Sequence, residues 1–316
     1  MSRPVLRMGN TLFSISIIST YLLICSLASA QQLNTGKTDD SVKLRVNMIN
    51  LNVSVIDPDG KFVRGLSKEN FEVFEDKTQQ SINLFAFEDL PISIGFIFDV
   101  SGSMTGKAAR ARDALREFVN ICHPDDEMFL IGFNTTAKLL VDNTKNDSEV
   151  INSVTMMPTA GNTALYDAVY MGVEKLKQSR YNRKVLLIIS DGQDNNSRYT
   201  EKEIKDLVKE SDVEIFSIGT TAIWQQISLD DYYGMEVLDN LGTMTGGTAY
   251  FPRDFNEMAR VCHNIGAELR NQYSIGYVPT NAKFDGKWRK LKVRIKGVKD
   301  SGFYVLRTRN GYYARQ

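Results

Sequence analysis

Histidine and cysteine are scarce in this 316-residue sequence, which contains two histidines and three cysteines. Each histidine directly follows a cysteine, in the pairs Cys122-His123 and Cys262-His263. Adjacent positions on a helix point about 100° apart, so both members of such a pair cannot easily reach one ion. The sequence therefore gives little support to a zinc site built from cysteine and histidine.

An excess of one charge sign is also missing. Lysine plus arginine number 38, and aspartate plus glutamate number 38. Strong positive charge is what draws a protein to nucleic acid or to an anionic membrane surface. The balanced charge gives neither class of partner an electrostatic basis, so we expect no nucleic acid partner and a partner that is recognised locally.

Long apolar runs are missing outside the N-terminal region. There, Arg3 and Arg7 precede an apolar run from Leu12 to Cys25, and Ala28-Ser29-Ala30 follows it. This order is typical of an export signal. We predict a signal peptide over residues 1–30, with an uncleaved anchor helix as the alternative. The mature chain is then expected to be periplasmic, on the cell surface or secreted, and not inserted in a membrane.

Changes in hydrophobic period divide the mature chain. Residues 31–40 are polar and predict a flexible lead-in, whereas residues 41–90 and 271–316 alternate apolar and polar side chains as β-strands do. Residues 91–270 alternate apolar runs with helical stripes, which predicts an α/β domain with a doubly wound, mostly parallel sheet flanked by helices. Because each β segment alone is marginal in size, we predict that the two pair into one small β-sandwich with the α/β domain inserted.

The expected elements of the α/β region follow from these patterns. The segment Trp224 to Tyr233 is expected to be a loop, either a specificity loop or a packed surface loop. Expected strands lie at residues 92–98, 128–133, 185–189, 213–218 and 248–251, and expected helices around residues 111–122, 165–176, 204–208, 236–244 and 258–269.

Small oxygen-bearing side chains gather where three of these elements begin or end. Asp99, Ser101 and Ser103 follow the first central strand, Thr163 precedes the second long helix, and Asp191 follows a buried strand. Each alone is explained by a helix cap or a turn. Together they lie where open α/β sheets bind ligands, and hard oxygen ligands suit a divalent ion, Mg²⁺ or Mn²⁺ in its place.

The stretches Asp99-Val100-Ser101-Gly102-Ser103, Thr163 and Asp191-Gly192 resemble the metal-ion-dependent adhesion site of von Willebrand factor type A domains, over about residues 91–270. The resemblance implies that Ser101 and Ser103 bind the ion directly, Thr163 directly or through water, and Asp99 and Asp191 mainly through water. Three flanking segments are similar to an exported, acidobacterial branch of such proteins: Gly65-Leu66, Phe71 to Asp76 and Arg309 to Ala314.

The resemblance also implies a function. One coordination position is left for an aspartate or glutamate carboxylate of a protein partner, so we expect an exported, non-enzymatic binding or adhesion module. The alternative is a structural or assembly subunit of a cell-envelope complex that uses mainly the β-sandwich. A metal-assisted hydrolase is a weaker third hypothesis, because no G-x-S-x-G elbow surrounds Ser101 and no general base is evident.

Two cysteines, Cys122 and Cys262, remain after removal of the signal. They lie on the apolar stripes of the first and last helices of the α/β region, which the family fold packs on the same face of the sheet. Export to an oxidising compartment makes a disulfide between them chemically possible. A disulfide and two buried thiols both remain open.

Overall fold

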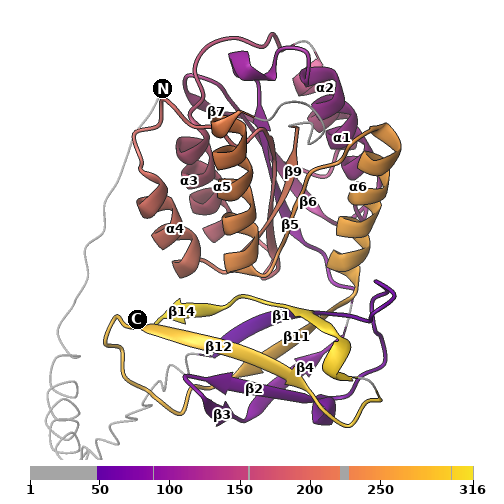
Figure 1. Ribbon diagram of the computed structural model, residues 1–316, viewed down its shortest axis with the longest axis vertical. Coiled ribbons are helices and arrows are strands. Elements are labelled where there is room, and N and C mark those ends of the chain that lie inside the picture. Colours follow the sequence, from indigo (N-terminus) through magenta and orange to yellow (C-terminus); the bar gives the residue numbers. More distant parts are fainter. Residues whose placement is uncertain (1–47, 88, 156, 221–227, 300, 316) are drawn as a thin grey trace, which may run out of the picture. The chain divides into compact units, whose positions relative to one another are not determined.

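The computed structural model describes residues 48–316 apart from residues 88, 156, 221–227, 300 and 316. The expected signal peptide, the lead-in and the start of the first β segment lie outside the described residues. The described chain forms one six-stranded sheet between helices and two four-stranded antiparallel sheets (Figure 1). No helix within these residues combines the length and the apolar character needed to cross a bilayer.

The six-stranded sheet is parallel except at one edge. Its two central strands are buried along almost their whole length, as expected for strands covered on both faces. The edge strand β7 runs antiparallel to β6. In sheet order the strands are β10 (Ala249–Tyr250), β9 (Val213–Gly219), β8 (Lys184–Ser190), β5 (Ser93–Asp99), β6 (Glu127–Phe133) and β7 (Ala137–Thr144).

Helices cover both faces of this sheet (Figure 1). Phe96 and Phe98 of β5 pack with the first group of helices, and Ile97 between them packs with the second group. The prediction of a doubly wound α/β sheet is therefore confirmed. The first group is α1 (Ala108–Asn120), α2 (Asp147–Thr155) and α6 (Phe255–Arg270), and the second is α3 (Leu165–Lys177), α4 (Glu201–Glu210) and α5 (Leu229–Thr245).

The two smaller sheets each join strands from the beginning and the end of the chain. β1 (Ile49–Ile56) pairs with β11 (Gln272–Tyr277), and β2 (Phe71–Glu75) pairs with β12 (Trp288–Ile295). Apolar residues from both sheets form one core, so the predicted β-sandwich with an inserted α/β domain is also confirmed. The remaining elements are β3 (Thr78–Gln80), β4 (Ile82–Ala86), β13 (Val305–Arg307), β14 (Gly311–Tyr313) and the short 3₁₀ helices Lys68–Asn70, Gly102–Met104 and Ser301–Phe303.

Helix α5 begins earlier than the sequence pattern predicted. The expected loop ran from Trp224 to Tyr233, but Leu229–Tyr233 is helical, while residues 224–227 lie outside the described residues. Ser228 explains the difference, because its hydroxyl accepts the backbone N–H of Asp231 at 3.1 Å and its own N–H donates to the Asp231 carboxylate at 3.1 Å. This reciprocal cap starts α5 before its apolar stripe of Val237, Leu238 and Leu241 begins. Strand β7 and helix α2 were also missed.

Buried polar side chains join the sandwich to the lower end of the central sheet. The Arg183 guanidinium donates to the Leu269 carbonyl at 2.6 Å and to Gln272 Oε1 at 2.5 Å. Gln272 Nε2 in turn donates to Glu214 Oε1 at 2.7 Å. Burial, together with the nearby charge of Glu268, raises the pKa of Glu214 to about 8.

Candidate metal-binding site

Four of the five expected ligands are buried where the central strands of the six-stranded sheet end. β5 ends at Asp99 and the adjacent parallel strand β8 ends at Ser190, directly before Asp191. Thr163 lies two residues before α3. Asp99, Ser101, Thr163 and Asp191 have at most 2% of their surface exposed. The structure therefore brings the three parts of the motif together at the carboxyl ends of the strands.

The Asp99 carboxylate is held by two hydrogen bonds. Its Oδ1 accepts the backbone N–H of Ser101 at 2.8 Å, and its Oδ2 accepts the hydroxyl of Ser190 at 2.6 Å. Burial raises the pKa of Asp99 to about 6, and the neighbouring charge of Asp191 adds to the rise, while the hydrogen bonds from Ser101 and Ser190 oppose it. Two buried carboxylates, Asp99 and Asp191, are stable in ionised form only beside positive charge or hydrogen-bond donors.

The two serines lie in a short turn directly after β5. Their hydroxyl oxygens are 2.9 Å apart. Between them, the Gly102 N–H donates to the Gly161 carbonyl at 2.9 Å, which ties this turn to the loop that leads to Thr163. A Cβ atom at Gly102 would lie 3.1 Å from that carbonyl oxygen, so the close approach favours glycine.

Thr163 is clamped by the loop that follows Asp191. Its N–H donates to Asn195 Oδ1 at 2.9 Å, and its carbonyl accepts the backbone N–H groups of Asn195 and Asn196, each at 3.0 Å. Within the described part of the chain, no hydrogen bond engages the Thr163 hydroxyl. The backbone is thus fixed by neighbours while the hydroxyl remains available to a ligand.

A lysine that the sequence analysis did not single out reaches this site. Lys107 Nζ lies 2.9 Å from Asp191 Oδ2, and the Asp191 side chain is fully buried. The Gln193 N–H donates to the other carboxylate oxygen of Asp191 at 3.3 Å. Lys107 precedes α1 and is 84 positions away from Asp191 in sequence, so no spacing pattern signals the contact.

The donor set fits a hard divalent cation. The described residues hold no group of three or more His, Cys, Asp or Glu side chains arranged to bind a metal. The expected site is of another kind, with two carboxylates and three hydroxyls. Asp191 has a cation at ion-pair distance, whereas the partners of Asp99 are neutral donors. Oxygen donors around buried negative charge are the ligands that Mg²⁺ and Mn²⁺ prefer.

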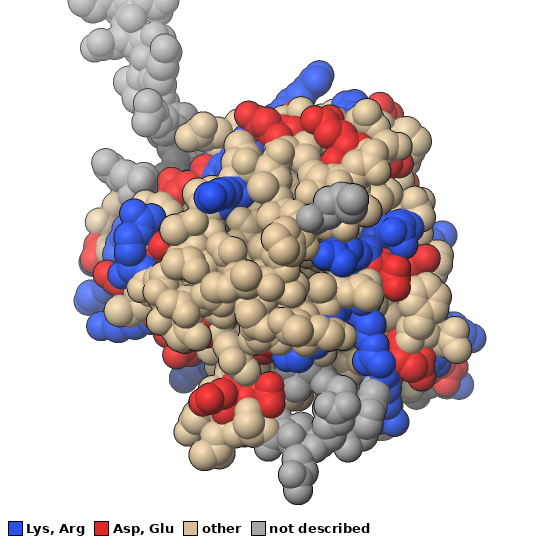
Figure 2. All heavy atoms as spheres, turned by 90° about the horizontal axis from the view of Figure 1, so that it is seen from above, with Lys and Arg blue, Asp and Glu red and all other residues tan. Residues whose placement is uncertain are grey.

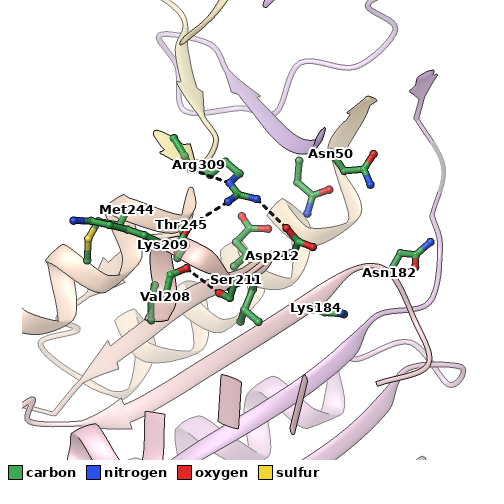
Figure 3. Close-up of a pocket in the computed structure, with 14 residues that line it drawn as sticks. Asn50, Asn182, Lys184, Val208, Lys209, Ser211, Asp212, Met244, Thr245 and Arg309 are labelled. Carbon is green, nitrogen blue, oxygen red and sulfur yellow. Dashed lines mark hydrogen bonds and ion pairs between the residues drawn. The ribbon is translucent and has the colours of Figure 1, made fainter. Parts of the chain in front are cut away.

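A separate cavity lies where the sandwich meets α4 and α5 (Figure 3). It has a volume of about 160 Å³. Arg309 crosses it, with its guanidinium donating to Asp212 Oδ1 at 2.9 Å and to the Lys209 carbonyl at 3.3 Å. These contacts fix the end of α4 to the chain before β14, so we interpret this cavity as a packing joint rather than a second ligand site.

Cys122 and Cys262 are both thiols in the structure. The Cys122 thiol donates to the Phe118 carbonyl at 3.4 Å, and the Cys262 thiol to the Ala114 carbonyl at 3.5 Å. Burial raises the pKa of both groups, that of Cys262 to about 12. In the structure Cys122 is half-buried and Cys262 is buried, and the disulfide between them stays a prediction.

Comparison with known proteins places the chain in a family. A comparison with curated proteins found no match. Among solved structures, a von Willebrand factor type A protein from Catenulispora acidiphila is 12% identical, with a TM-score of 0.45 over 84% of this chain and 71% of that one. The PilB minor pilin from Streptococcus sanguinis is 16% identical, with a TM-score of 0.46 over 59% of this chain and 63% of the pilin.

A third solved structure, BatB from Bacteroides thetaiotaomicron, is 12% identical, with a TM-score of 0.44 over 56% of this chain and 98% of that one. These three likenesses are too distant to bear on function, and this chain spans less than two thirds of the pilin. A sequence model of the von Willebrand factor type A domain matches residues 93–263, more than half of the chain. Domains of this type are typically protein-interaction modules. The chain therefore belongs to the von Willebrand factor type A domain family.

Proposed function

We propose that the protein binds a divalent ion, Mg²⁺ or Mn²⁺, at a metal-ion-dependent adhesion site and uses it to engage a partner protein. The observation that carries the proposal is the pair of fully buried carboxylates, Asp99 and Asp191, at the ends of adjacent strands. Three hydroxyl side chains accompany them, and the ammonium of Lys107 neutralises one carboxylate. The ligand set is Asp99, Ser101, Ser103, Thr163 and Asp191.

The residues have different roles in this proposal. Ser101 and Ser103 would contact the ion through their hydroxyls, and Thr163 directly or through water. Asp99 and Asp191 would act mainly through water, with Asp99 held in place by Ser101 and Ser190. Because these carboxylates reach the ion only through water, the ion stays electrophilic. When bound, the ion supplies a position for an aspartate or glutamate carboxylate of the partner.

The surface around the site supports a protein partner. Viewed from this end of the sheet, uncharged residues fill the centre of the face and charged residues lie around it (Figure 2). Beside Asp191, Gly192 packs so closely on Gly234 of α5 that a Cβ atom would lie 2.1 Å from the Gly234 carbonyl oxygen. Directly before Gly234 in α5, Tyr232 and Tyr233 are 60% and 59% exposed. Exposed tyrosines are enriched in the centres of protein interfaces.

Calorimetric titration of Mg²⁺ into the metal-stripped protein tests the proposal. We expect saturable binding that is lost in Asp99→Ala/Ser101→Ala. Asp254→Ala is the matched control, because the Asp254 carboxylate caps α6 by accepting the Glu257 N–H at 2.8 Å and lies outside the proposed ligand set. Full binding by the double variant, with its fold verified by circular dichroism, would remove the basis of the proposal.

The alternative function is an assembly subunit of a cell-envelope complex that makes its contacts mainly through the β-sandwich. One observation favours it: the outer face of β12 carries an unusual concentration of positive charge, described below. Export of the chain is part of both proposals and rests on the signal-like residues 1–30.

A further inference from the structure

Three cations stand in a row on the outer face of the sandwich. Lys290, Lys292 and Arg294 are exposed at alternate positions of β12, whereas Leu291 and Val293 between them are buried in the sandwich core. Alternate residues of a strand lie about 6.6 to 6.8 Å apart, so the row is roughly 13 Å long. We name these three residues the basic row.

The side chains of the basic row form no ion pairs among the described residues, although Glu72 is the cross-strand partner of Arg294 and the Asp76 carboxylate accepts the backbone N–H of Lys290. Within the described part of the chain, none of its side chains lies at ion-pair distance from a carboxylate, whereas Lys296, directly after β12, pairs with Glu72 at 3.1 Å. Lys77 lies nearby in the tight turn between β2 and β3, where Asp76 and Lys77 have φ values of 45° and 74°. The chain as a whole is neutral, but this face is locally positive.

The basic row borders a hollow with an apolar floor. Phe74 of β2 is the direct cross-strand partner of Lys292, and the Arg294 guanidinium lies 5.0 Å from the centre of the Phe74 ring. The aliphatic stems of the lysines extend this floor and leave their ammonium groups at the rim. The lining residues are Phe74, Asp76, Lys77, Lys290, Lys292 and Arg294.

We propose that this hollow binds an extended acidic segment of a partner protein, laid along β12 with aspartate or glutamate side chains at alternate positions facing the basic row. An extended segment repeats its same-side residues at the spacing of the row itself, because both are β-strands in geometry. Methylene groups of the segment pack on Phe74 and the lysine stems. Charge complementarity selects an acidic segment over a neutral one.

Nucleic acid and a membrane surface fit the hollow less well. Single-stranded nucleic acid binds through several aromatic side chains on which successive bases stack, but Phe74 is the one aromatic residue of the lining. A flat anionic membrane would also press its headgroups against Glu72 and Asp76, which flank Phe74 at alternate positions. A single extended chain along β12 meets the three cations, whereas Glu72 is already paired with Lys296 and the Asp76 carboxylate already accepts the Lys290 N–H at 2.9 Å.

A fluorescent ten-residue peptide of alternating glutamate and valine, titrated with the full chain in chelator at low ionic strength, tests this proposal. We expect saturable binding that falls at least about tenfold in Lys290→Gln/Lys292→Gln/Arg294→Gln, because three exposed charge pairs are removed. Binding is also expected to weaken in about 0.5 M salt. A peptide with glutamine in place of glutamate should not bind.

Two control proteins make the result specific. Arg116→Gln/Lys138→Gln/Lys202→Gln removes the same net charge from other exposed positions and should bind the peptide normally. Asp99→Ala should also bind normally, because the hollow is independent of the proposed metal site. Absence of peptide binding, equal binding by the basic-row variant, or tighter binding to anionic vesicles or to oligothymidylate would each overturn the proposal.

Discussion

The ammonium of Lys107 lies 2.9 Å from a carboxylate oxygen of Asp191, a side chain that is fully buried at the end of β8. The contact joins the start of α1 to the central sheet. It gives Asp191 a positive partner within the protein itself. A divalent ion that acts through Asp191 must share this carboxylate with Lys107, so the lysine tunes the affinity of the proposed metal site.

Replacing Lys107 with methionine should therefore tighten Mg²⁺ binding by about three- to tenfold, because a positive charge near the ion is removed. Without metal, the variant should unfold more easily, since a buried carboxylate loses its partner. Thermal unfolding with and without Mg²⁺ measures both effects, and Mg²⁺ should raise the Tm of the variant more than that of the native protein. Arg116→Met, farther along α1, is the control. A weaker response of the variant to Mg²⁺ would contradict this role of Lys107.

Glu214 should make stability depend on pH. Its pKa is about 8 in the folded protein, above its ordinary value of 4.5, so the folded state holds a proton that the unfolded state has lost between these two values. Stability should then fall as pH rises from about 4.5 to about 8. Its neighbours are Glu268, which raises this pKa further, and Arg183 and Gln272, which lower it.

Glu214→Gln mimics the protonated side chain and should remove this loss. Urea unfolding at a series of pH values should show the variant matching the native protein near pH 4.5 and exceeding it at pH 8 by on the order of 1–3 kcal/mol. Glu236→Gln, at an exposed position of α5, should not change the pH profile. Parallel profiles for native protein and Glu214→Gln would show that Glu214 is ionised in the folded state.

The thiols of Cys122 and Cys262 should be inert in the folded protein. Burial raises the pKa of both, so few thiolates are present at neutral pH. A thiol reagent should react with neither residue in native conditions and with both in denaturant without reductant. The test is most informative on protein recovered from an oxidising compartment. Cysteines that stay unreactive in denaturant would show that the disulfide forms there and would contradict the prediction.

The sequence predicted what depends on local period and missed what depends on packing. Sequence patterns predicted the buried strands β5 and β8 and the amphipathic helices α1 and α3, because each of these patterns lies within one element. The same holds for Asp99 and Asp191, whose positions at strand ends follow from the order of elements. The start of α5 could have been predicted from the sequence, since Ser228 and Asp231 have the spacing of a capping box.

Other contacts of the site had no sequence signal. Lys107 contacts Asp191, and Asn195 binds the backbone of Thr163. Both contacts form only because loops from different strands converge at the carboxyl ends of the sheet. The hydrogen bond between Arg183 and Gln272 likewise depends on how the sandwich packs against the central sheet. Side-chain partners of this kind follow from tertiary geometry, which no spacing along the chain encodes.

The most direct test of the central claim is an anomalous difference map from crystals of the protein soaked in Mn²⁺. We expect a peak at the carboxyl ends of β5 and β8, within coordination distance of the Ser101 and Ser103 hydroxyls and beside Thr163 and Asp191. No such peak should appear in Asp99→Ala/Ser101→Ala crystals. A Mn²⁺ peak elsewhere, or a native site that stays empty in saturating Mn²⁺, would contradict it.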